Sequence, residues 1–189
     1  MTPDWTAVFI MPPLMDYRDV RTEKELLPNL VGGQATARNV TETASRFLRS
    51  SGFKTFDENG LRPDQKKALD ESLKSLGIQI DEWVRRSKGK QLPVSFVRQL
   101  CSETNAQAVL FNLLKVKLGE GAFWDPNSGM IAPGANTSQI VAFLVDVETG
   151  DIVWRNELFL RDKPDTQIFN KSLEMLFSKL PARAKEGTR

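Results

Sequence analysis

The residue types that most often carry out acid–base and metal chemistry are scarce in this sequence. Its 189 residues include no histidine, which is the commonest general base and a common metal ligand. The one cysteine, Cys101, can form neither an intrachain disulfide nor a cysteine-rich zinc site. Because Cys101 lies on the apolar stripe of an expected helix, we interpret it as a small buried residue and not as a nucleophile. Carboxylate or lysine chemistry stays open, but no constellation of residues indicates an enzyme or a cofactor.

Three acids gather around one turn, namely Asp146, Glu148 and Asp151. Such a cluster can bind calcium or magnesium, but this spacing lacks the glycine-centred loop and distal glutamate of the familiar calcium loop. Aspartate and glycine also suit a hairpin turn, because both tolerate a positive φ. We therefore expect a turn here and no metal site.

Gly32 and Gly33 precede an expected helix, where free backbone N–H groups can hold a phosphate. The lysine of the Walker pattern and the spaced glycines of dinucleotide-binding folds are both missing. A flexible connection explains the two glycines equally well, so they indicate no cofactor site.

One basic cluster lies in the segment RRSKGK and comprises Arg85, Arg86, Lys88 and Lys90, with Trp83 beside it. A group of cations next to an aromatic ring that can stack on bases is typical of nucleic-acid binding. The net charge of the chain is only +2, however, so no large field steers nucleic acid toward it. Cations at a helix end also interact favourably with the helix dipole. Nucleic-acid binding through this cluster is the alternative function.

The segment at about 119–138 has the sequence GEGAFWDPNSGMIAPGANTS, and we expect it to be a long loop. Long loops in compact domains are usually functional or disordered. This one carries Phe123, Trp124, Met130 and Ile131, and aromatic and methionine side chains are favoured at interfaces. Two interpretations stay open: a partner-binding loop, or a small apolar cluster folded back onto the edge of a sheet.

The elements that would position these residues follow from hydrophobic periodicity. In the last expected strand Ile152, Trp154 and Leu158 fall on one face, with Arg155 and Glu157 on the other. Strands are expected at 6–11, 52–58, 108–118, 139–147 and 152–160, and helices at 39–52, 93–107 and 163–180. The last helix turns four residues inward, namely Phe169, Leu173, Leu176 and Leu180.

This order predicts a single α/β domain over residues 1–189, with a polar helical insertion at about 61–92. Its fold class is an α/β (α+β) sandwich: a mixed sheet of four to five strands that ends in an antiparallel hairpin, with helices packed on its faces. No apolar run approaches the roughly 20 residues of a membrane-spanning helix. The opening segment MTPDWTAVFIMPP does not have the pattern of a signal peptide.

Three segments, AVFIMPP, LCSETNAQAVLFNLLKV and FLVDVETGDIVWRNEL, resemble the α/β domain of a group of bacterial envelope proteins. The group includes the curli-secretion lipoprotein, the outer-membrane lipoproteins that activate penicillin-binding proteins, and the amino-terminal domain of the Tol-system propeller protein. The resemblance implies a periplasmic protein, tethered to the outer membrane by a lipid, that acts by contact with another envelope protein or with copies of itself and not by catalysis. A cytoplasmic location is the alternative.

The sequence departs from that group in two respects. Its only cysteine is Cys101, so a lipid-acceptor cysteine would have to precede Met1 in a longer precursor. The polar helical stretch at about 61–92 is also longer than a minimal member needs. The segment at 119–138 lacks the sustained apolar alternation of membrane-inserting strands, so no pore is expected.

Overall fold

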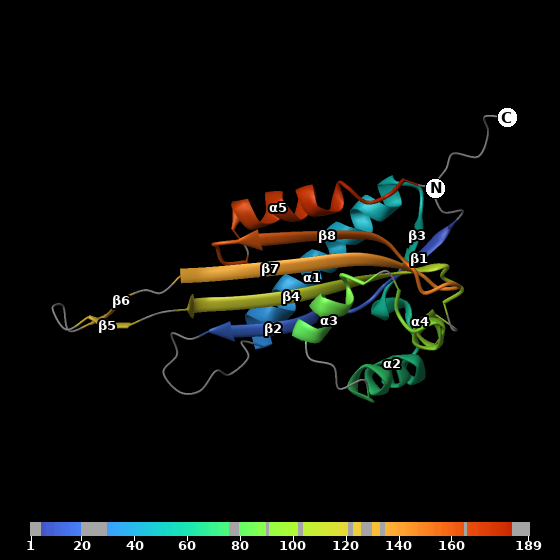
Figure 1. The fold of residues 1–189 in the computed structure, drawn as a ribbon, viewed down its shortest axis with the longest axis horizontal. Helices are drawn as coiled ribbons and strands as arrows, with labels where there is room; N and C mark the ends of the chain where they lie inside the picture. The colour runs from blue at the N-terminus through green and yellow to red at the C-terminus, as the bar shows by residue number, and fades with distance from the viewer. Residues whose placement is uncertain are drawn as a thin grey trace.

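The structure is a computed structural model, and it describes residues 5–19, 30–75, 80–89, 91–101, 104–120, 123–125, 130–132, 135–164 and 166–182. Figure 1 shows the fold. The strands are β1 (Ala7–Ile10), β2 (Leu14–Asp19), β3 (Lys54–Phe56), β4 (Ala108–Glu120), β5 (Phe123–Asp125), β6 (Met130–Ala132), β7 (Ala135–Asp146) and β8 (Ile152–Leu160). The helices are α1 (Leu30–Ser50), the short 3-10 helix η1 (Glu58–Gly60), α2 (Pro63–Ser75), α3 (Ile80–Arg86), α4 (Val94–Cys101) and α5 (Gln167–Phe177).

A mixed sheet of six strands forms the centre of the fold, in the order β3-β1-β4-β7-β8, with β2 pairing with β4 in line with β1. The pairs β1–β3, β1–β4 and β2–β4 are parallel, whereas β4–β7 and β7–β8 are antiparallel. The predicted α/β class and the closing hairpin are therefore confirmed. The predicted number of four to five strands is too low, because β2 was not expected.

The two prolines after β1 explain why β2 escaped prediction. Pro12 and Pro13 cannot donate backbone hydrogen bonds, which indicates the end of a strand. In the structure Ile10 pairs with Leu110 and Leu14 pairs with Leu113. Three residues, 11–13, therefore lie opposite two residues of β4, so the prolines occupy a bulge and the chain rejoins the sheet beyond them.

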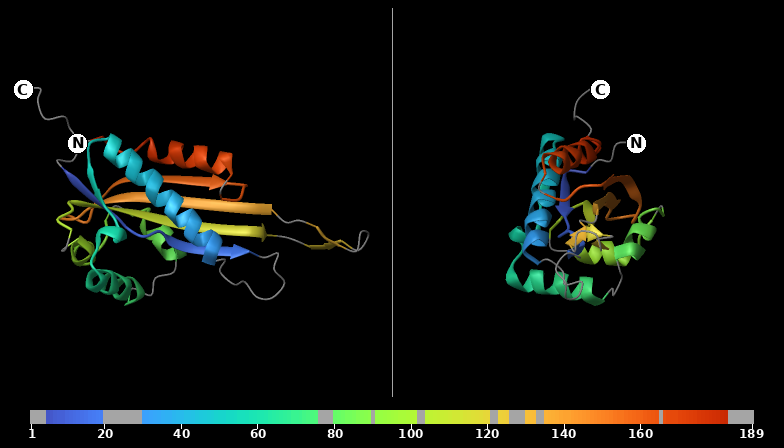
Figure 2. Two further views of the ribbon diagram at one scale, coloured as in Figure 1. Left: turned by 180° about the vertical axis from the view of Figure 1, so that it is seen from behind. Right: turned by 90° about the vertical axis from the view of Figure 1, so that its left-hand side faces the viewer.

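The sheet separates two apolar cores, because alternate residues of β4 point to opposite faces. Figure 2 shows α1 and α5 crossing one face, and Figure 1 shows α3 and α4 on the other. The four residues that were predicted to point inward from the last helix are all buried: Phe169, Leu173 and Leu176 of α5, and Leu180 three residues beyond its end. Val40, Ala44 and Leu48 of α1 are buried in the same core. Leu69, Val97 and Cys101 belong to the core on the opposite face.

Helix α1 begins nine residues before the expected start at Asn39, so Gly32 and Gly33 lie inside its first turns and not ahead of it. The spacing of Asn39 and Glu42 resembles a capping box, which misplaced the start. Asn39 instead lies within the helix, where its side-chain amide donates to the Asn170 side chain of α5 at 2.8 Å. The two glycines therefore lie in a helix and not in a connection that leads into one.

A bulge near the start of β8 places Ile152 on the face of the sheet opposite to the one expected from the sequence. Leu144 pairs with Trp154 while Val145 pairs with Ile152, so Val153 is an extra residue on β8. Because an extra residue reverses the alternation, Ile152 packs against the core under α3 and α4. Trp154 and Leu158 pack against the core under α1 and α5, as expected. The prediction that Ile152 shares their face is wrong.

Candidate partner-binding hairpin and the polar face of the sheet

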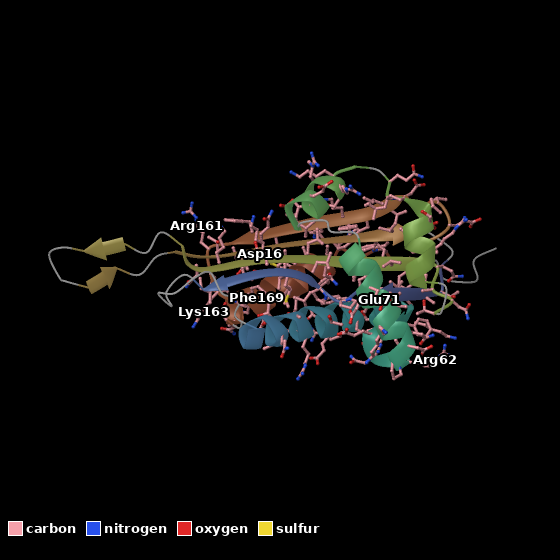
Figure 3. The ribbon with its side chains drawn as sticks, turned by 90° about the horizontal axis from the view of Figure 1, so that it is seen from below. Asp16, Arg62, Glu71, Arg161, Lys163 and Phe169 are labelled. Atoms are coloured by element: carbon pink, nitrogen blue, oxygen red, sulfur yellow. The ribbon has the colours of Figure 1, made fainter. Side chains whose placement is uncertain are left out.

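The segment predicted as one long loop is largely strand in the structure. Strand β4 continues to Glu120 and β7 begins at Ala135, so the two central strands extend into the segment from both sides. Between them β5 and β6 form a separate two-stranded sheet. Figures 1 and 3 show this hairpin standing off beyond the ends of β4 and β7. The segment therefore extends the sheet and then carries a second, smaller one.

The pairing of β4 with β7 is irregular where the two strands enter this segment. Lys117 pairs with Thr137 but Glu120 pairs with Ala135, which leaves a register shift between them. Gly119 has a φ of 72°, and its backbone N–H donates to the Asn136 side chain at 3.1 Å. A bulge bends its strand and increases the twist. The sequence offered one signal for it, the glycine within an apolar strand.

The four residues predicted to bind a partner all lie on the two strands of the hairpin. Trp124 pairs with Ile131, Asp125 with Met130, and Phe123 with Ala132. The structure thus places these four residues on one small element, two on each strand: Phe123 and Trp124 on β5, and Met130 and Ile131 on β6. Among the residues that the structure describes, β5 and β6 pair only with each other and not with the edge of the six-stranded sheet.

Of the three acids at the β7–β8 turn, Asp146 holds the backbone of the turn with its carboxylate. Asp146 Oδ1 accepts hydrogen bonds from the backbone N–H groups of Glu148 and Thr149 at 2.9 and 2.8 Å, and its Oδ2 accepts one from the Trp5 indole at 2.8 Å. Within the described ranges, no three residues among cysteine, aspartate, glutamate and histidine gather to hold a metal ion. Asp146 is a turn residue, as the sequence indicated.

Cys101 is buried on α4, on the inward stripe where the sequence placed it. Burial raises the pKa of its thiol to about 12, and a hydrogen bond with Thr104 lowers it only in part. Because the thiolate is the reactive form, Cys101 is almost entirely protonated at neutral pH and a poor nucleophile.

The basic cluster is partly neutralised by one acid. Arg86 and Arg85 both contact Glu82 of α3, at 2.9 and 3.4 Å. Hydrogen bonds from Arg86, opposed by some desolvation and aided by the charges of both arginines, lower the pKa of Glu82. Lys88 is exposed beyond the helix, the backbone of Trp83 lies within α3, and Lys90 falls outside the described residues.

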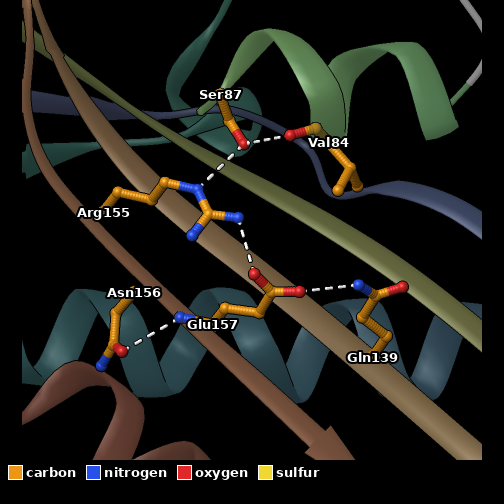
Figure 4. Close-up of polar contacts among 6 residues, drawn as sticks. All are labelled: Val84, Ser87, Gln139, Arg155, Asn156 and Glu157. Carbon is orange, nitrogen blue, oxygen red and sulfur yellow. Dashed lines mark hydrogen bonds and ion pairs between the residues drawn. The ribbon is translucent and has the colours of Figure 1, made fainter. Parts of the chain in front are cut away.

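A polar network that the sequence did not identify as a site joins α3 to the last two strands (Figure 4). Arg155 Nε donates to Ser87 Oγ at 3.1 Å, and the Ser87 hydroxyl donates to the Val84 carbonyl at 2.7 Å. Glu157 accepts from Arg155 at 2.7 Å and from the Gln139 side chain at 2.7 Å. The only signal was that Arg155 and Glu157 alternate with the apolar residues of β8.

The charges around Glu157 set its protonation. Burial by itself would raise the pKa of Glu157. Hydrogen bonds from Arg155 and Gln139, with the charges of Arg155 and Lys88, outweigh burial and lower the pKa below its ordinary value. Glu157 is therefore ionised at neutral pH and forms an ion pair with Arg155, whose Nε contacts Ser87 just beyond α3.

Across the described ranges, no helix combines the length and the apolar character that crossing a membrane requires.

Comparison with known proteins gives structural matches only. No family model matches the sequence, and no curated protein does. The PelC dodecamer from Paraburkholderia phytofirmans matches with 13% identity and a TM-score of 0.47 over 97% of this chain and 94% of that chain. Lipoprotein GNA1162 from Neisseria meningitidis matches with 16% identity and a TM-score of 0.39 over 87% and 85% of the two chains. The LpoB C-terminal domain from Salmonella enterica matches with 18% identity and a TM-score of 0.38 over 85% and 86%.

One of these solved structures is named a lipoprotein, and all of them match this chain along most of its length. A lipoprotein is also what the three sequence segments resemble. At these identities and TM-scores the likeness says nothing about activity or partner. The function of this chain therefore rests on its own residues.

Proposed function

We propose that this protein is a non-enzymatic protein of the bacterial cell envelope that docks a partner protein through the hairpin β5–β6. The supporting observation is that the hairpin is a sheet of its own, set beyond the ends of β4 and β7, and built from two strands of three residues each. Four of those six positions are large apolar residues, namely Phe123, Trp124, Met130 and Ile131.

A hairpin of this kind is expected to be more stable in contact with another protein surface than on its own. An isolated two-stranded hairpin is only marginally stable in water, and among the described residues no third strand pairs with β5 or β6. Tryptophan anchors are among the residues that contribute most to protein interfaces, and methionine adapts to irregular surfaces. Contact with a partner would both bury these residues and stabilise the pairing of Trp124 with Ile131.

The proposal also covers the location of the protein. The resemblance of the three sequence segments supports the periplasmic side of the outer membrane, with a lipid tether. Fractionation of cells that express the whole gene tests this location, and we expect the protein in the outer-membrane fraction. Recovery in the cytosol would contradict the envelope location without bearing on the hairpin.

The docking role is tested by replacing one large apolar residue on each strand of the hairpin with serine, in the double variant Trp124→Ser/Met130→Ser. We expect the tagged wild type to retain a defined partner from a detergent extract of envelopes, and the variant to lose it. The thermal midpoint should stay nearly unchanged, because the hairpin does not pair with the main sheet. Phe159→Ser is the matched control, since Phe159 is 60% exposed on β8.

The outcome against the proposal is equally concrete. Undiminished partner retention by the double variant would exclude the hairpin as the docking element. Loss of retention in Phe159→Ser alone would move the docking surface to the face of β8.

No observation favours the nucleic-acid alternative, because Glu82 already binds two of the clustered arginines. The alternative would require that the protein shift the electrophoretic mobility of labelled RNA or DNA at low ionic strength, and that this binding weaken as the salt concentration rises.

A further inference from the structure

The borders of the six-stranded sheet differ in how much backbone they leave open to pairing. Strand β3 is only three residues long, and a short edge offers few backbone groups. Strand β8 begins with a bulge at Val153, and the Asn156 side chain joins it to the Leu176 carbonyl of α5 at 3.0 Å. Strand β2 is six residues long, and within the described ranges its backbone pairs with β4 alone. It is the border most open to a further strand.

A groove of about 880 Å³ lies along this border, between the sheet and α1. Its sheet side is apolar and includes Pro12, Pro13 and Met15, and its helix side is a polar flank of α1 that includes Arg38 and Glu42. Figure 3 looks at this border from below and shows β2 beside α1. The groove thus offers a ligand an apolar surface, two opposite charges and the open backbone of a strand.

The two charges on the helix side have no partner in the described part of the chain. Arg38 and Glu42 are both exposed, and they form an ion pair neither with each other nor with another described side chain. Two other arginines of the groove are bound within the chain: Arg46 to Glu174 at 2.8 Å, and Arg49 to Thr55 at 2.7 Å. Arg38 and Glu42 therefore remain available to a ligand of opposite charges.

The spacing of these charges fits an extended peptide. Four residues of a helix rise by about 6 Å, which is the separation of Arg38 and Glu42 along α1. Residues two apart in a strand are separated by about 6.6 Å and point to the same side. An acid and a base with a single residue between them can therefore face Arg38 and Glu42 together.

The direction of α1 sets the order of that acid and that base. Ser45 of α1 bonds to Thr55 of β3 at 3.1 Å, and β3 pairs with β1. The later residues of α1 thus lie beside β1 and the earlier ones beside β2, so α1 and β2 run in opposite directions (Figure 2). A peptide antiparallel to β2 passes Arg38 before Glu42, and its acid therefore comes before its base.

We propose that this groove binds an extended peptide of a partner protein, which adds to the sheet as a strand antiparallel to β2. An acidic residue of the peptide contacts Arg38, and a basic residue two positions later contacts Glu42. In such strand addition the main-chain hydrogen bonds give affinity and the alternate side chains give specificity. The antiparallel direction is the slightly more stable one. A single short strand buries little surface, so the binding is weak and reversible.

The probe is a fluorescent peptide with blocked ends and the sequence Thr-Val-Glu-Val-Lys-Val-Thr, in which valine and threonine favour a strand. Fluorescence polarisation with the intact chain measures its dissociation constant. We expect saturable binding that is several-fold tighter than for the peptide with both charges replaced by glutamine. The double variant Trp124→Ser/Met130→Ser should bind the probe as the wild type does, so this site and the hairpin β5–β6 can fail separately.

Charge exchange in the protein identifies the contacting residues. Arg38→Glu and Glu42→Arg should each weaken probe binding about three- to tenfold, because an attractive contact becomes a repulsive one. The double variant Arg38→Glu/Glu42→Arg should instead prefer the exchanged peptide Thr-Val-Lys-Val-Glu-Val-Thr. The matched control is Lys67→Glu/Glu71→Lys on α2, a pair with the same order and spacing, and it should bind the probe unchanged. Thermal midpoints check that each variant folds.

Backbone methylation of the probe tests the strand pairing itself. Successive N–H groups of a strand point to opposite edges, so only alternate ones face β2. Methylating the nitrogen of the glutamate or of the central valine should therefore abolish binding in one case and leave it nearly unchanged in the other. Equal binding of the two methylated peptides would overturn strand addition.

Three further results would overturn the proposal. The first is no saturable binding of either charged peptide to the wild type. The second is binding that Arg38→Glu and Glu42→Arg leave unchanged. The third is a wild-type dimer in sedimentation velocity that Arg38→Glu/Glu42→Arg dissociates, which would assign the groove to a second copy of the chain. Preference of the wild type for the exchanged peptide would overturn the antiparallel direction.

Discussion

Gly150 ends the β7–β8 turn in a conformation and a location that a side chain does not tolerate. Its φ is 75°, and a Cβ built there would lie 2.4 Å from the Leu92 carbonyl oxygen and 3.0 Å from Val94 Cγ2. The Gly150 carbonyl also accepts a hydrogen bond from the Leu92 N–H at 2.8 Å. The turn is thus held directly against the segment that leads into α4.

We expect Gly150→Ala to lower the free energy of unfolding by about 2–4 kcal/mol, because left-handed strain and a backbone clash add together. Chemical denaturation monitored by circular dichroism measures this change. Gly60→Ala is the control, since a Cβ at Gly60 meets no atom within 4 Å. Equal stability of Gly150→Ala and the wild type would show that the turn can move away from Leu92.

Asn112 is the polar residue on the inward face of β4, between Leu110 and Leu114 of the core under α1 and α5. Only 1% of it is exposed, and neither amide atom has a hydrogen-bond partner in the described part of the chain. Burying an amide without a partner costs free energy that an apolar side chain of similar size does not.

Asn112→Leu should therefore raise the free energy of unfolding by about 1–2 kcal/mol, which corresponds to roughly 2–8 °C in thermal midpoint for a chain of this size. Differential scanning calorimetry measures the shift. Asn112→Asp serves as the comparison and should lower the midpoint, because it buries a charge. A fall in midpoint for Asn112→Leu would mean that the amide is satisfied in solution.

At the scale of elements, α3 contacts the sheet through hydrogen bonds as well as through the apolar side chain of Val84. Arg155 reaches Ser87 just beyond the helix, and Glu157 holds Arg155 in that position. The lowered pKa of Glu157 means that its ionised form stabilises the folded state. That contribution is present above the ordinary pKa of a glutamate and is lost as the pH falls through the lower pKa of the folded state.

We expect Glu157→Gln to be less stable than the wild type at neutral pH, by less than about 1 kcal/mol because Glu157 is partly exposed and screened. The difference should shrink as the pH falls below the ordinary glutamate range. Urea denaturation at a series of pH values measures it. Glu71→Gln on α2 is the matched control for an exposed glutamate in an ion pair. A difference that stays constant with pH would show that the ionised form of Glu157 does not carry the stabilisation.

At the scale of the whole molecule, the six-stranded sheet separates a core under α1 and α5 from a core under α3 and α4. The hairpin β5–β6 lies beyond the ends of β4 and β7, at one end of this layered arrangement (Figure 1). The proposed docking element is therefore set apart from both cores, which is why its substitution is expected to leave the thermal midpoint nearly unchanged.

Periodicity along the chain was enough to predict most of the elements and several of the buried residues. The inward residues of α5 and the alternation of β4 follow from local spacing, since a helix and a strand each repeat their faces at a fixed interval. The turn at Asp146 likewise follows from local chemistry, because a carboxylate there can accept the N–H groups of the next residues.

The sequence by itself thus determined the α/β class, the closing hairpin, the burial of Cys101 and the gathering of apolar residues between 123 and 131. Only the tertiary structure decided that the chain rejoins the sheet as β2 after two prolines, and that the bulge at Val153 turns Ile152 to the opposite core. It also brought Ser87 and Arg155 together from distant parts of the chain. The physical reason is that bulges, edges and long-range hydrogen bonds depend on which strands become neighbours, and no local repeat contains that information.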